Sequence, residues 1–490
     1  MARFLRKSLI LLHRYLGILL CLFFVMWFLS GIVMIYAKGM PEISPESRLA
    51  HLAPLDLSRI HITPSEAASH AGMDDGVSPR LTLLTLMGRP AFRFATSDME
   101  TVFADTGEMM IPPNPEVAAS IAGKFLNLSE TAIHFDHTLD EADQWTIGNR
   151  RILPLHKFNV DDAAGTQIYV SQRSGEVGMV TTRSSRALAW ISAIPHWMYL
   201  KSLRLNNSLW QSVVLWISGV GTIAAAMGIL LAVVQYSRRP PHIRYSGWMR
   251  WHYITGAIFG AFTLTWVFSG FLSMEPWDWA SEGGLGEGMA EAFRGGSLDL
   301  KQFPAMDATE WKTLLSGGSI KEVEFLRIQG NPYYAVRGDS FEPVLAEAMP
   351  LHVRKDLFSV DSLVERAKQA NPDIPVTEMQ NLSQYDSYYY ARGDEAPLPV
   401  LRIKFGDPDQ TWFYIDPKMG RIVARFQRRE RLQRWIYHGL HSLDFSFWYY
   451  NRPAWDIGVI ALCSGGAMLS AIGVVISVRR LRLDARKILR

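Results

Sequence analysis

Four histidines are the side chains best placed to do chemistry in this sequence. His13 and His252 border long apolar stretches, and His196 and His441 lie shortly before two others. An ionisable group near hydrocarbon is costly and usually has a partner, and a neutral imidazole is a common metal ligand. These positions therefore predict metal ligation. The simpler interpretation, in which the rings cap helices or contact lipid headgroups, stays open.

An internal duplication sorts these histidines into two pairs. A shift of 239 residues places His13 on His252, and it also matches Gly17, Phe23, Trp27, Ser30 and Gly31 with Gly256, Phe262, Trp266, Ser269 and Gly270. A shift of 245 residues places His196 on His441, and it also matches Pro154, Tyr169, Gly175, Trp190, Trp210 and Gly228 with Pro399, Tyr414, Gly420, Trp435, Trp455 and Gly473. Each half holds a span, an exported domain and a second span. We therefore expect parallel repeats related by a pseudo-two-fold axis along the membrane normal.

The elements that position the histidines are four uncharged stretches: Tyr15–Ala37, Leu205–Ser237, Tyr253–Met274 and Ile457–Val478. A hydrocarbon core of about 30 Å needs about 20 helical residues, and each stretch is long enough to cross it. Hydrophobic residues make up 48% of the chain and charged residues 20%, which excludes a disordered protein and argues against an ordinary cytosolic enzyme. The first stretch has no small-residue cleavage site after it, so we expect an uncleaved anchor.

The charge distribution predicts the topology. Residues 1–14, 237–250 and 479–490 contain 14 of the 50 Lys and Arg residues but only one of the 47 acidic residues. Basic flanks stay in the cytoplasm, so both termini and the central link are expected there. The segments 38–204 and 275–452 are then periplasmic in a bacterial inner-membrane protein. The chain outside the three basic segments has 36 basic and 46 acidic residues, a net charge of −10.

The predicted organisation therefore alternates between membrane and periplasm. Its parts are a cytoplasmic N-terminus with the first helix (1–37), a periplasmic domain (38–204), the second helix (205–237), a cytoplasmic loop (238–250), the third helix (251–274), a second periplasmic domain (275–452), the fourth helix (453–478) and a cytoplasmic tail (479–490).

Both exported segments show a helix-then-strand pattern, which predicts small α+β units with a helix on a short antiparallel sheet, two in each segment. Helices are expected from Pro64, at Glu116–Phe125 and at Ser359–Ala370. Strands are expected at Leu81–Met87, Ala91–Ala95, Leu153–Val160, Gln167–Val170, Val400–Phe405 and Trp412–Ile415.

Four short segments resemble a known family. Gln167–Val177 and Trp412–Gly420 resemble the YVDPxTGEV hairpin of PepSY domains, and Leu12–Gly17 and Trp251–Gly256 resemble the LHRxLG opening of PepSY-associated transmembrane helices. The resemblance covers nearly the whole chain, although Met419 and Arg421 replace the usual Thr and Glu of the second hairpin. The family includes four-span inner-membrane ferrisiderophore reductases that bind b-type haem through histidines. It therefore implies a four-span bundle with two PepSY-like domains, and a redox activity.

Geometry points to the same cofactor. Two residues exchanged by a two-fold axis reach one iron together only when the iron lies near that axis, and a haem with an imidazole on each side has this arrangement. His13 and His252 would hold one haem near the cytoplasmic face, and His196 and His441 a second near the periplasmic face. The chain has two cysteines and no CxxCH motif, so both haems would be noncovalent, b-type.

The second periplasmic ligand is ambiguous, because His438 and His441 are three residues apart and would share a helix face. The repeat register selects His441, since His438 matches Ala193. His438 stays a substitute ligand or a residue that orients one. His134 and His137 have a helical spacing that a metal site would use, but a solvated face is the preferred interpretation, and His156 is expected to be structural. The remaining histidines, at 51, 61, 70, 242 and 352, are expected on the surface.

These features favour an electron-transfer protein over the alternatives. Electrons would pass from an unidentified cytoplasmic or quinol donor to a periplasmic acceptor, and the resemblance implies a ferric siderophore. The main rival is a non-enzymatic PepSY membrane module that binds or regulates a periplasmic partner or peptidase. The span interiors contain no Asp, Glu, Lys or Arg, which disfavours ion-coupled transport. No hydrolase or nucleotide-binding motif is present, and no nucleic-acid partner is expected.

Overall fold

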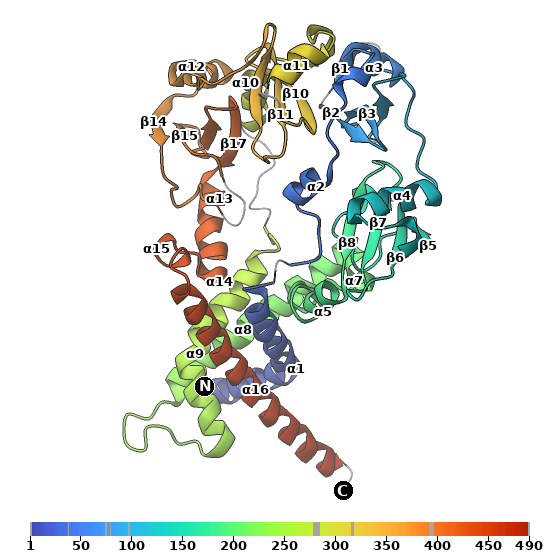
Figure 1. The fold of residues 1–490 in the computed structure, drawn as a ribbon. Coiled ribbons are helices and arrows are strands. Elements are labelled where there is room, and N and C mark those ends of the chain that lie inside the picture. The colour runs from blue at the N-terminus through green and yellow to red at the C-terminus, as the bar shows by residue number, and fades with distance from the viewer. Residues whose placement is uncertain are drawn as a thin grey trace. The chain divides into compact units, whose positions relative to one another are not determined.

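A computed structural model describes residues 2–37, 39–73, 76–78, 80–96, 99–277, 285–314, 318–391 and 396–488. The chain forms two compact units (Figure 1). The helical unit comprises Met1–Met40, Ser184–Ser281 and Arg429–Arg490. The sheet unit comprises Pro41–Arg183 and Glu282–Arg428.

Four helices in the described part of the chain are long and apolar enough to cross a membrane: α1 (Ala2–Met34), α8 (Asn207–Gln235), α9 (Gly247–Leu272) and α16 (Ala454–Ile488). α1 packs on α16 and α8, and α9 packs on α8 and α16. The prediction of four helices with the length and composition of membrane spans is confirmed, and these helices support a multi-pass membrane protein.

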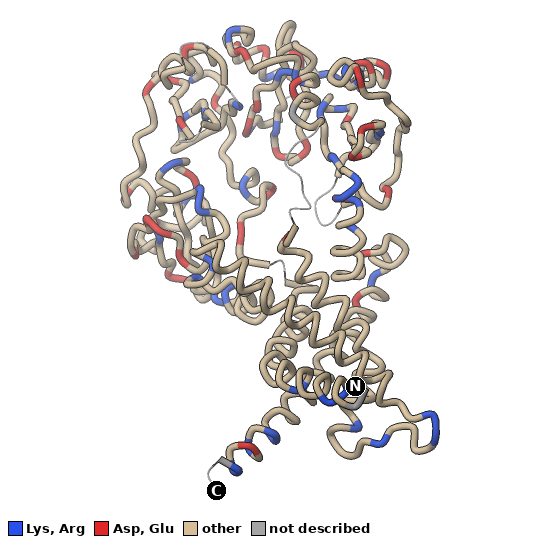
Figure 2. The backbone as a smooth tube through the Cα atoms, turned by 180° about the vertical axis from the view of Figure 1, so that it is seen from behind, with Lys and Arg blue, Asp and Glu red and all other residues tan. Residues whose placement is uncertain are grey.

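The helices extend beyond the uncharged stretches. α1 includes Arg6 and Lys7, α9 includes Arg250, and α16 continues to Ile488. Arg and Lys are good helix formers, so the backbone does not unwind where the hydrocarbon ends. Figure 2 shows Lys and Arg in the link between α8 and α9 and along the end of α16, whereas the middle of each long helix is uncharged.

Short helices precede α8 and α16 at corresponding places. Before α8 lie α5 (Arg183–Ile191), α6 (Ala193–Trp197) and α7 (Lys201–Arg204). Before α16 lie α13 (Arg428–Gln433), the π-helix η5 (Arg434–Gly439), α14 (Leu440–Ser442) and α15 (Ser446–Tyr449). α6 packs on α1, and α14 packs on α9.

The largest sheet of the sheet unit has seven strands in the described residues. Their order is β13 (Leu351–Val353), β12 (Val344–Ala348), β11 (Asn331–Arg337), β10 (Glu322–Ile328), β2 (Leu81–Leu86), β3 (Arg89–Phe94) and β4 (Thr101–Phe103). Its core is aromatic and aliphatic, with Phe92, Phe325 and Tyr334 buried.

Two smaller sheets each have four strands as described. One contains β5 (Ile133–Leu139), β6 (Leu155–Val160), β7 (Gln167–Ser171) and β8 (Val177–Thr181), covered by α4 (Pro115–Leu126). The other contains β14 (Val376–Leu382), β15 (Val400–Phe405), β16 (Trp412–Asp416) and β17 (Arg421–Phe426), covered by α12 (Val360–Ala370). The remaining elements are α2 (Pro45–His51), η1 (Leu57–Arg59), α3 (Pro64–His70), β1 (Val77–Ser78), η2 (Glu130–Ala132), η3 (Arg150–Ile152), α10 (Gly286–Arg294), β9 (Leu298–Asp299), η4 (Leu300–Gln302) and α11 (Ala308–Leu314).

In each exported segment, one of the two expected α+β units corresponds to a four-stranded sheet. The other expected unit of each segment is not separate, because their strands form one seven-stranded sheet. β2 pairs with β10 in an antiparallel register that places Leu81 opposite Phe325. The segments 38–204 and 275–452 therefore contribute strands to one sheet, where the chain order suggested a separate unit in each. Pairing completes the hydrogen bonds of two strands that would otherwise be exposed edges.

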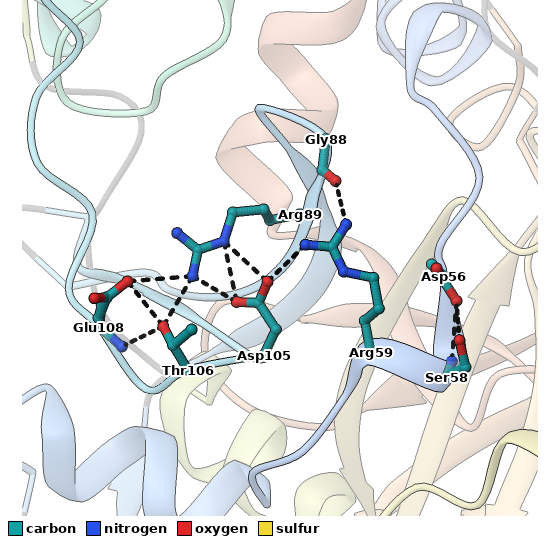
Figure 3. A network of polar contacts seen from close by, with 8 residues as sticks. All are labelled: Asp56, Ser58, Arg59, Gly88, Arg89, Asp105, Thr106 and Glu108. Carbon is teal, nitrogen blue, oxygen red and sulfur yellow. Dashed lines mark hydrogen bonds and ion pairs between the residues drawn. The ribbon is translucent and has the colours of Figure 1, made fainter.

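A polar network fixes the hairpin of β3 and β4 (Figure 3). Asp105 accepts hydrogen bonds from Arg89 Nε at 2.9 Å and Nη2 at 2.7 Å, and from Arg59 at 2.9 Å. The guanidinium of Arg89 also lies over the ring of Phe103. The bonds from Arg89 hold the pKa of the Asp105 carboxyl below its usual range. The contact orders the turn after β4.

A second network ties a small sheet to the large one. Glu176, directly before β8, forms ion pairs with Arg93 on β3 and with Arg48, whose Nε lies 3.1 Å away. Arg48 also pairs with Glu322 on β10 at 2.7 Å. Burial alone would raise the pKa of Glu176, but the two guanidinium groups outweigh it and lower the pKa. The carboxylate is therefore a charged link between sheets.

Replacing Glu176 by alanine should destabilise the sheet unit, because Arg93 loses the carboxylate that it pairs with and Arg48 keeps only Glu322. Breaking a largely buried ion pair costs about 3 kcal/mol, which corresponds to a melting temperature roughly 5–10 °C lower. Differential scanning fluorimetry of the full-length protein in detergent measures it, with Glu141→Ala at an exposed carboxylate as the control.

The same pair has a defined pH dependence. The unfolded Glu176 carboxyl titrates near 4.5 and the folded one lower, so its contribution is complete above that pH and is lost as the pH falls further. The melting-temperature difference between Glu176→Ala and wild type should shrink in acid. A difference that persists unchanged at the lowest pH where the protein folds would contradict the role of charge.

Candidate functional site

The structure brings the four histidines together in two pairs, all within the helical unit. His13 of α1 and His252 of α9 have ring centroids 6.3 Å apart. His196 of α6 and His441 of α14 have ring centroids 6.0 Å apart. The members of each pair come from corresponding halves of the chain, as the repeat register predicts.

These separations match two imidazoles that share one metal ion. An imidazole nitrogen lies about 2.0–2.1 Å from a bound metal and about 1.1 Å from its ring centroid, so ligands on opposite sides have centroids about 6.3 Å apart. Each pair therefore has a ring separation compatible with two ligands on one ion, a separation that also lies within the range of ordinary contacts between rings. A direct hydrogen bond between two imidazoles would bring the rings closer.

Two serines determine the tautomers of His196 and His441. The Ser30 hydroxyl lies 3.1 Å from Nδ1 of His196, and it donates its proton to the carbonyl of Trp27 at 3.1 Å. A hydroxyl has one proton, so toward the imidazole Ser30 acts as an acceptor. Nδ1 of His196 therefore carries the ring proton, and Nε2 keeps its lone pair.

The second half repeats this arrangement. The Ser269 hydroxyl lies 2.9 Å from Nδ1 of His441 and donates to the carbonyl of Trp266 at 2.9 Å. Ser269 and Trp266 correspond to Ser30 and Trp27 under the shift of 239 residues. Both rings of this pair thus carry their proton on Nδ1.

At the pair of His13 and His252, a backbone carbonyl takes the place of the serine hydroxyl as the acceptor for Nδ1. Nδ1 of His13 lies 3.0 Å from the carbonyl of Ala224, so it donates there and leaves Nε2 free of protons. Leu469 matches Ala224 in the repeat, and its backbone lies beside the ring of His252. However, Nδ1 of His252 is buried and makes no hydrogen bond of normal geometry. This end of the pair is the less tightly oriented one.

Glycines leave the space that the rings occupy. A Cβ at Gly228 would lie 2.9 Å from the His13 ring, and one at Gly31 would lie 3.4 Å from the His196 ring. In the other half, a Cβ at Gly270 would lie 4.0 Å from the His441 ring and one at Gly473 would lie 3.9 Å from the His252 ring, which are ordinary van der Waals distances. The repeat register matches Gly31 with Gly270 and Gly228 with Gly473, but the sequence alone does not indicate that these glycines border the histidine rings.

A cavity of about 380 Å³ surrounds His13 and His252. Its walls come from α1, α8, α9 and α16, and they are mostly apolar, with Arg14 and Arg480 among the few charged side chains. Cofactor sites typically have volumes of about 300–1,000 Å³ with a few polar groups. The pair therefore lies in a space suited to an amphipathic organic group.

The two pairs lie toward opposite ends of α1 and α9. α1 carries His13 of the first pair and also Ser30, which contacts His196 of the second pair. α9 likewise carries His252 of the first pair and Ser269, which contacts His441 of the second pair. Each separation is 17 residues, or about 25 Å along a helix that rises about 1.5 Å per residue. This distance covers most of a hydrocarbon core of about 30 Å.

His196 stays neutral at physiological pH. Burial, followed by the nearby His441, lowers the pKa of His196 to about 4. A metal binds the neutral imidazole, and an ordinary histidine is partly protonated near its pKa of about 6.5. The environment therefore holds His196 in the form that a ligand needs.

His438 lies in the π-helix η5, and its ring contacts Tyr437 at a centroid distance of 4.7 Å. Tyr437 also contacts the ring of His441 at 5.4 Å. The ring that pairs with His196 is that of His441. The π-helix was not expected from the sequence; such segments are rare and often occur at functional sites.

The other histidines have structural or surface positions. His134 and His137 lie on strand β5, so their expected helical spacing is wrong; they contact Asp161 and Asp136. His156 is buried and bonded to Thr138 and Pro113, as expected for a structural residue. The five expected surface histidines are exposed: His51, His61, His70, His242 and His352.

No protein-family model and no curated protein matches this sequence. Within the described residues, no group of three or more His, Cys, Asp or Glu side chains is arranged to hold a metal ion. The histidine pairs are therefore the arrangement on which a functional interpretation of this chain rests.

Proposed function

We propose that this chain is a bacterial inner-membrane protein that binds two noncovalent b-type haems and passes electrons from the cytoplasmic side to a periplasmic ferric complex. The observation that carries the proposal is the pair of matched histidine sites. Each has the ring spacing of two ligands on one ion, and they lie about 25 Å apart along the same two helices.

The residues present fit a haem. His13 and His252 would ligate one iron through Nε2. Their cavity is lined in part by glycines, which leave room for a flat macrocycle. His196 and His441 would ligate the other iron. Arg14 and Arg480 offer positive charge to carboxylates at the first site. A haem ligated by two imidazoles supplies reversible one-electron transfer.

The cavity wall supports a tandem duplication with a pseudo-two-fold axis. Most of its residues fall into pairs separated by 239 or 245 positions, among them Ile10 with Met249, Gly17 with Gly256, Ala224 with Leu469, and Leu231 with Ile476. A flat macrocycle has two similar faces, and in this cavity each face would contact equivalent residues of the two halves.

The charge pattern supports the orientation. Arg6, Lys7 and Arg250 lie at the ends of α1 and α9 that carry His13 and His252, and basic flanks stay in the cytoplasm. The site of His196 and His441 would then face the periplasm together with the PepSY-like sheet unit. The electron donor would be a cytoplasmic reductant or a quinol.

The proposed acceptor is a ferric siderophore. Hard oxygen ligands hold ferric iron tightly, and reduction by one electron to ferrous iron weakens their hold. The chain outside the basic segments has a net charge of −10, which suits a neutral or cationic complex such as a ferric hydroxamate.

The purified detergent-solubilised protein should show a low-spin b-type haem spectrum, with sharp alpha and beta bands after dithionite reduction. Pyridine haemochrome analysis should give about two haems per chain, because there are two bis-histidine sites. A colourless protein from haem-replete cells would end the electron-transfer proposal and favour a binding or regulatory module.

Single alanine substitutions should assign the sites. His13→Ala and His252→Ala should affect the same haem, which is either lost or converted to high spin. His196→Ala and His441→Ala should affect the second haem in the same way. The reason is that each iron needs both imidazoles. Haem content and the reduced spectrum of each variant measure this, and His61→Ala at an exposed position is the control.

His438→Ala tests the choice between neighbouring histidines. It should leave both haems in place and at most perturb the His441 site through Tyr437. Loss of the periplasmic haem in His438→Ala, with retention in His441→Ala, would contradict the assignment.

The dithionite-reduced protein should be reoxidised by a ferric hydroxamate siderophore, with ferrous iron captured by ferrozine and followed by absorbance. The His196→Ala/His441→Ala variant should lose this reaction while its other site still reduces. Equally fast reoxidation in that variant would contradict the periplasmic exit route. If no ferric complex reoxidises the intact protein, the siderophore assignment fails.

A further inference from the structure

Ser30 and Ser269 touch the proposed iron ligands at equivalent places. Both side chains are buried, with exposed fractions of 2% and 0%. Each hydroxyl gives its proton to the carbonyl three residues earlier and lies within 3.1 Å of a histidine Nδ1. Each half of the chain thus contains the same two linked hydrogen bonds, one from the serine to a carbonyl and one between the serine and a histidine.

We propose that Ser30 and Ser269 are positioning residues that set the tautomer, ring orientation and donor strength of His196 and His441 toward the haem iron. This inference rests on the proposed function. A hydroxyl whose proton is committed to a carbonyl is polarised, which makes its oxygen a better acceptor for Nδ1–H. An acceptor at Nδ1 raises the basicity of the ligating nitrogen, and it fixes the ring plane.

The alternative is that the serines only fill space in the helix packing. Serines in long apolar helices commonly donate to a carbonyl three or four residues earlier. Ser218 of α8 is such a residue: it is buried and donates to the carbonyls of Val214 and Leu215. Within the described part of the chain, Ser218 makes no hydrogen bond to a histidine, so it provides a matched comparison.

The consequence concerns redox potential. A more basic ligand stabilises ferric iron more than ferrous iron, so loss of the acceptor should weaken ferric haem binding preferentially. Removing such a supporting partner typically weakens metal binding about 10–100-fold. If the loss falls on the ferric form, about tenfold corresponds to a rise of about 59 mV in the midpoint potential for one electron.

The experiment is a spectroelectrochemical titration of the full-length holoprotein, combined with EPR of the oxidised state. Ser30→Ala and Ser269→Ala should each raise the potential of the same haem by about 59 mV or more and shift its low-spin g-values. The other haem should keep its potential. The double variant should show a larger shift, because both ligands of one iron lose their acceptors.

Two further variants separate positioning from packing. Ser30→Thr keeps the hydroxyl and should keep the wild-type potential. Ser218→Ala removes a buried helical hydroxyl of the same kind and should leave both haems unchanged. Equal effects of Ser218→Ala and Ser30→Ala would overturn the inference.

The other outcomes are equally defined. If Ser30→Ala and Ser269→Ala leave the potentials and g-values unchanged, the serines are packing residues. A fall in potential would show that the Trp27 or Trp266 carbonyl is a better acceptor once the serine is gone, and it would also overturn the inference. If the wild-type protein binds no haem, the proposed function fails instead, so the two failures are distinguishable.

Discussion

The arrangement of the helical unit depends on the cost of placing imidazoles where little water is available. A buried polar nitrogen without a hydrogen bond costs about 1–3 kcal/mol, and each ring has two. His13, His196 and His441 each engage Nδ1 with a carbonyl or hydroxyl acceptor, which leaves Nε2 as a lone-pair donor. These contacts offset part of that cost and fix the ring proton of all three histidines on Nδ1.

The long helices connect the two sites mechanically. α1 carries His13 at one site and Ser30 at the other, and α9 carries His252 and Ser269 at the same spacing. A continuous helix fixes that spacing through its rise per residue, so neither site can move along the bundle without the other. Close packing of α1 on α16 and of α8 on α9 then sets the lateral positions. The two histidine pairs therefore depend on the same set of packed helices.

Features that depend on local chemistry were predictable from the sequence. Hydropathy identified all four spans, and strand and turn patterns placed β2, β7, β15 and β16 within a residue or two. The repeat register brought His196 and His441 into the same pair without any structural information. The shared seven-stranded sheet was not predictable, because Leu81 and Phe325 pair across about half of the chain and no local signal specifies that choice. The acceptor role of Ser30 was equally hidden, since a serine in an apolar helix has the same sequence signal with or without a histidine beside it.

The backbone that carries His196 and His441 gives a reason for their contacts with serine hydroxyls. His196 lies on the five-residue helix α6, and His441 lies near the end of a helical segment that runs without a break from α13 through η5 to α14. Each helix ends two residues later at a residue with positive φ, Met198 at 54° and Leu443 at 49°, which costs a side chain with a Cβ about 1–2 kcal/mol. Strain retained at matched positions beside a candidate site indicates that the backbone path is required there. The bonds to Ser30 and Ser269 add a second constraint on each ring, which comes from the long helices α1 and α9.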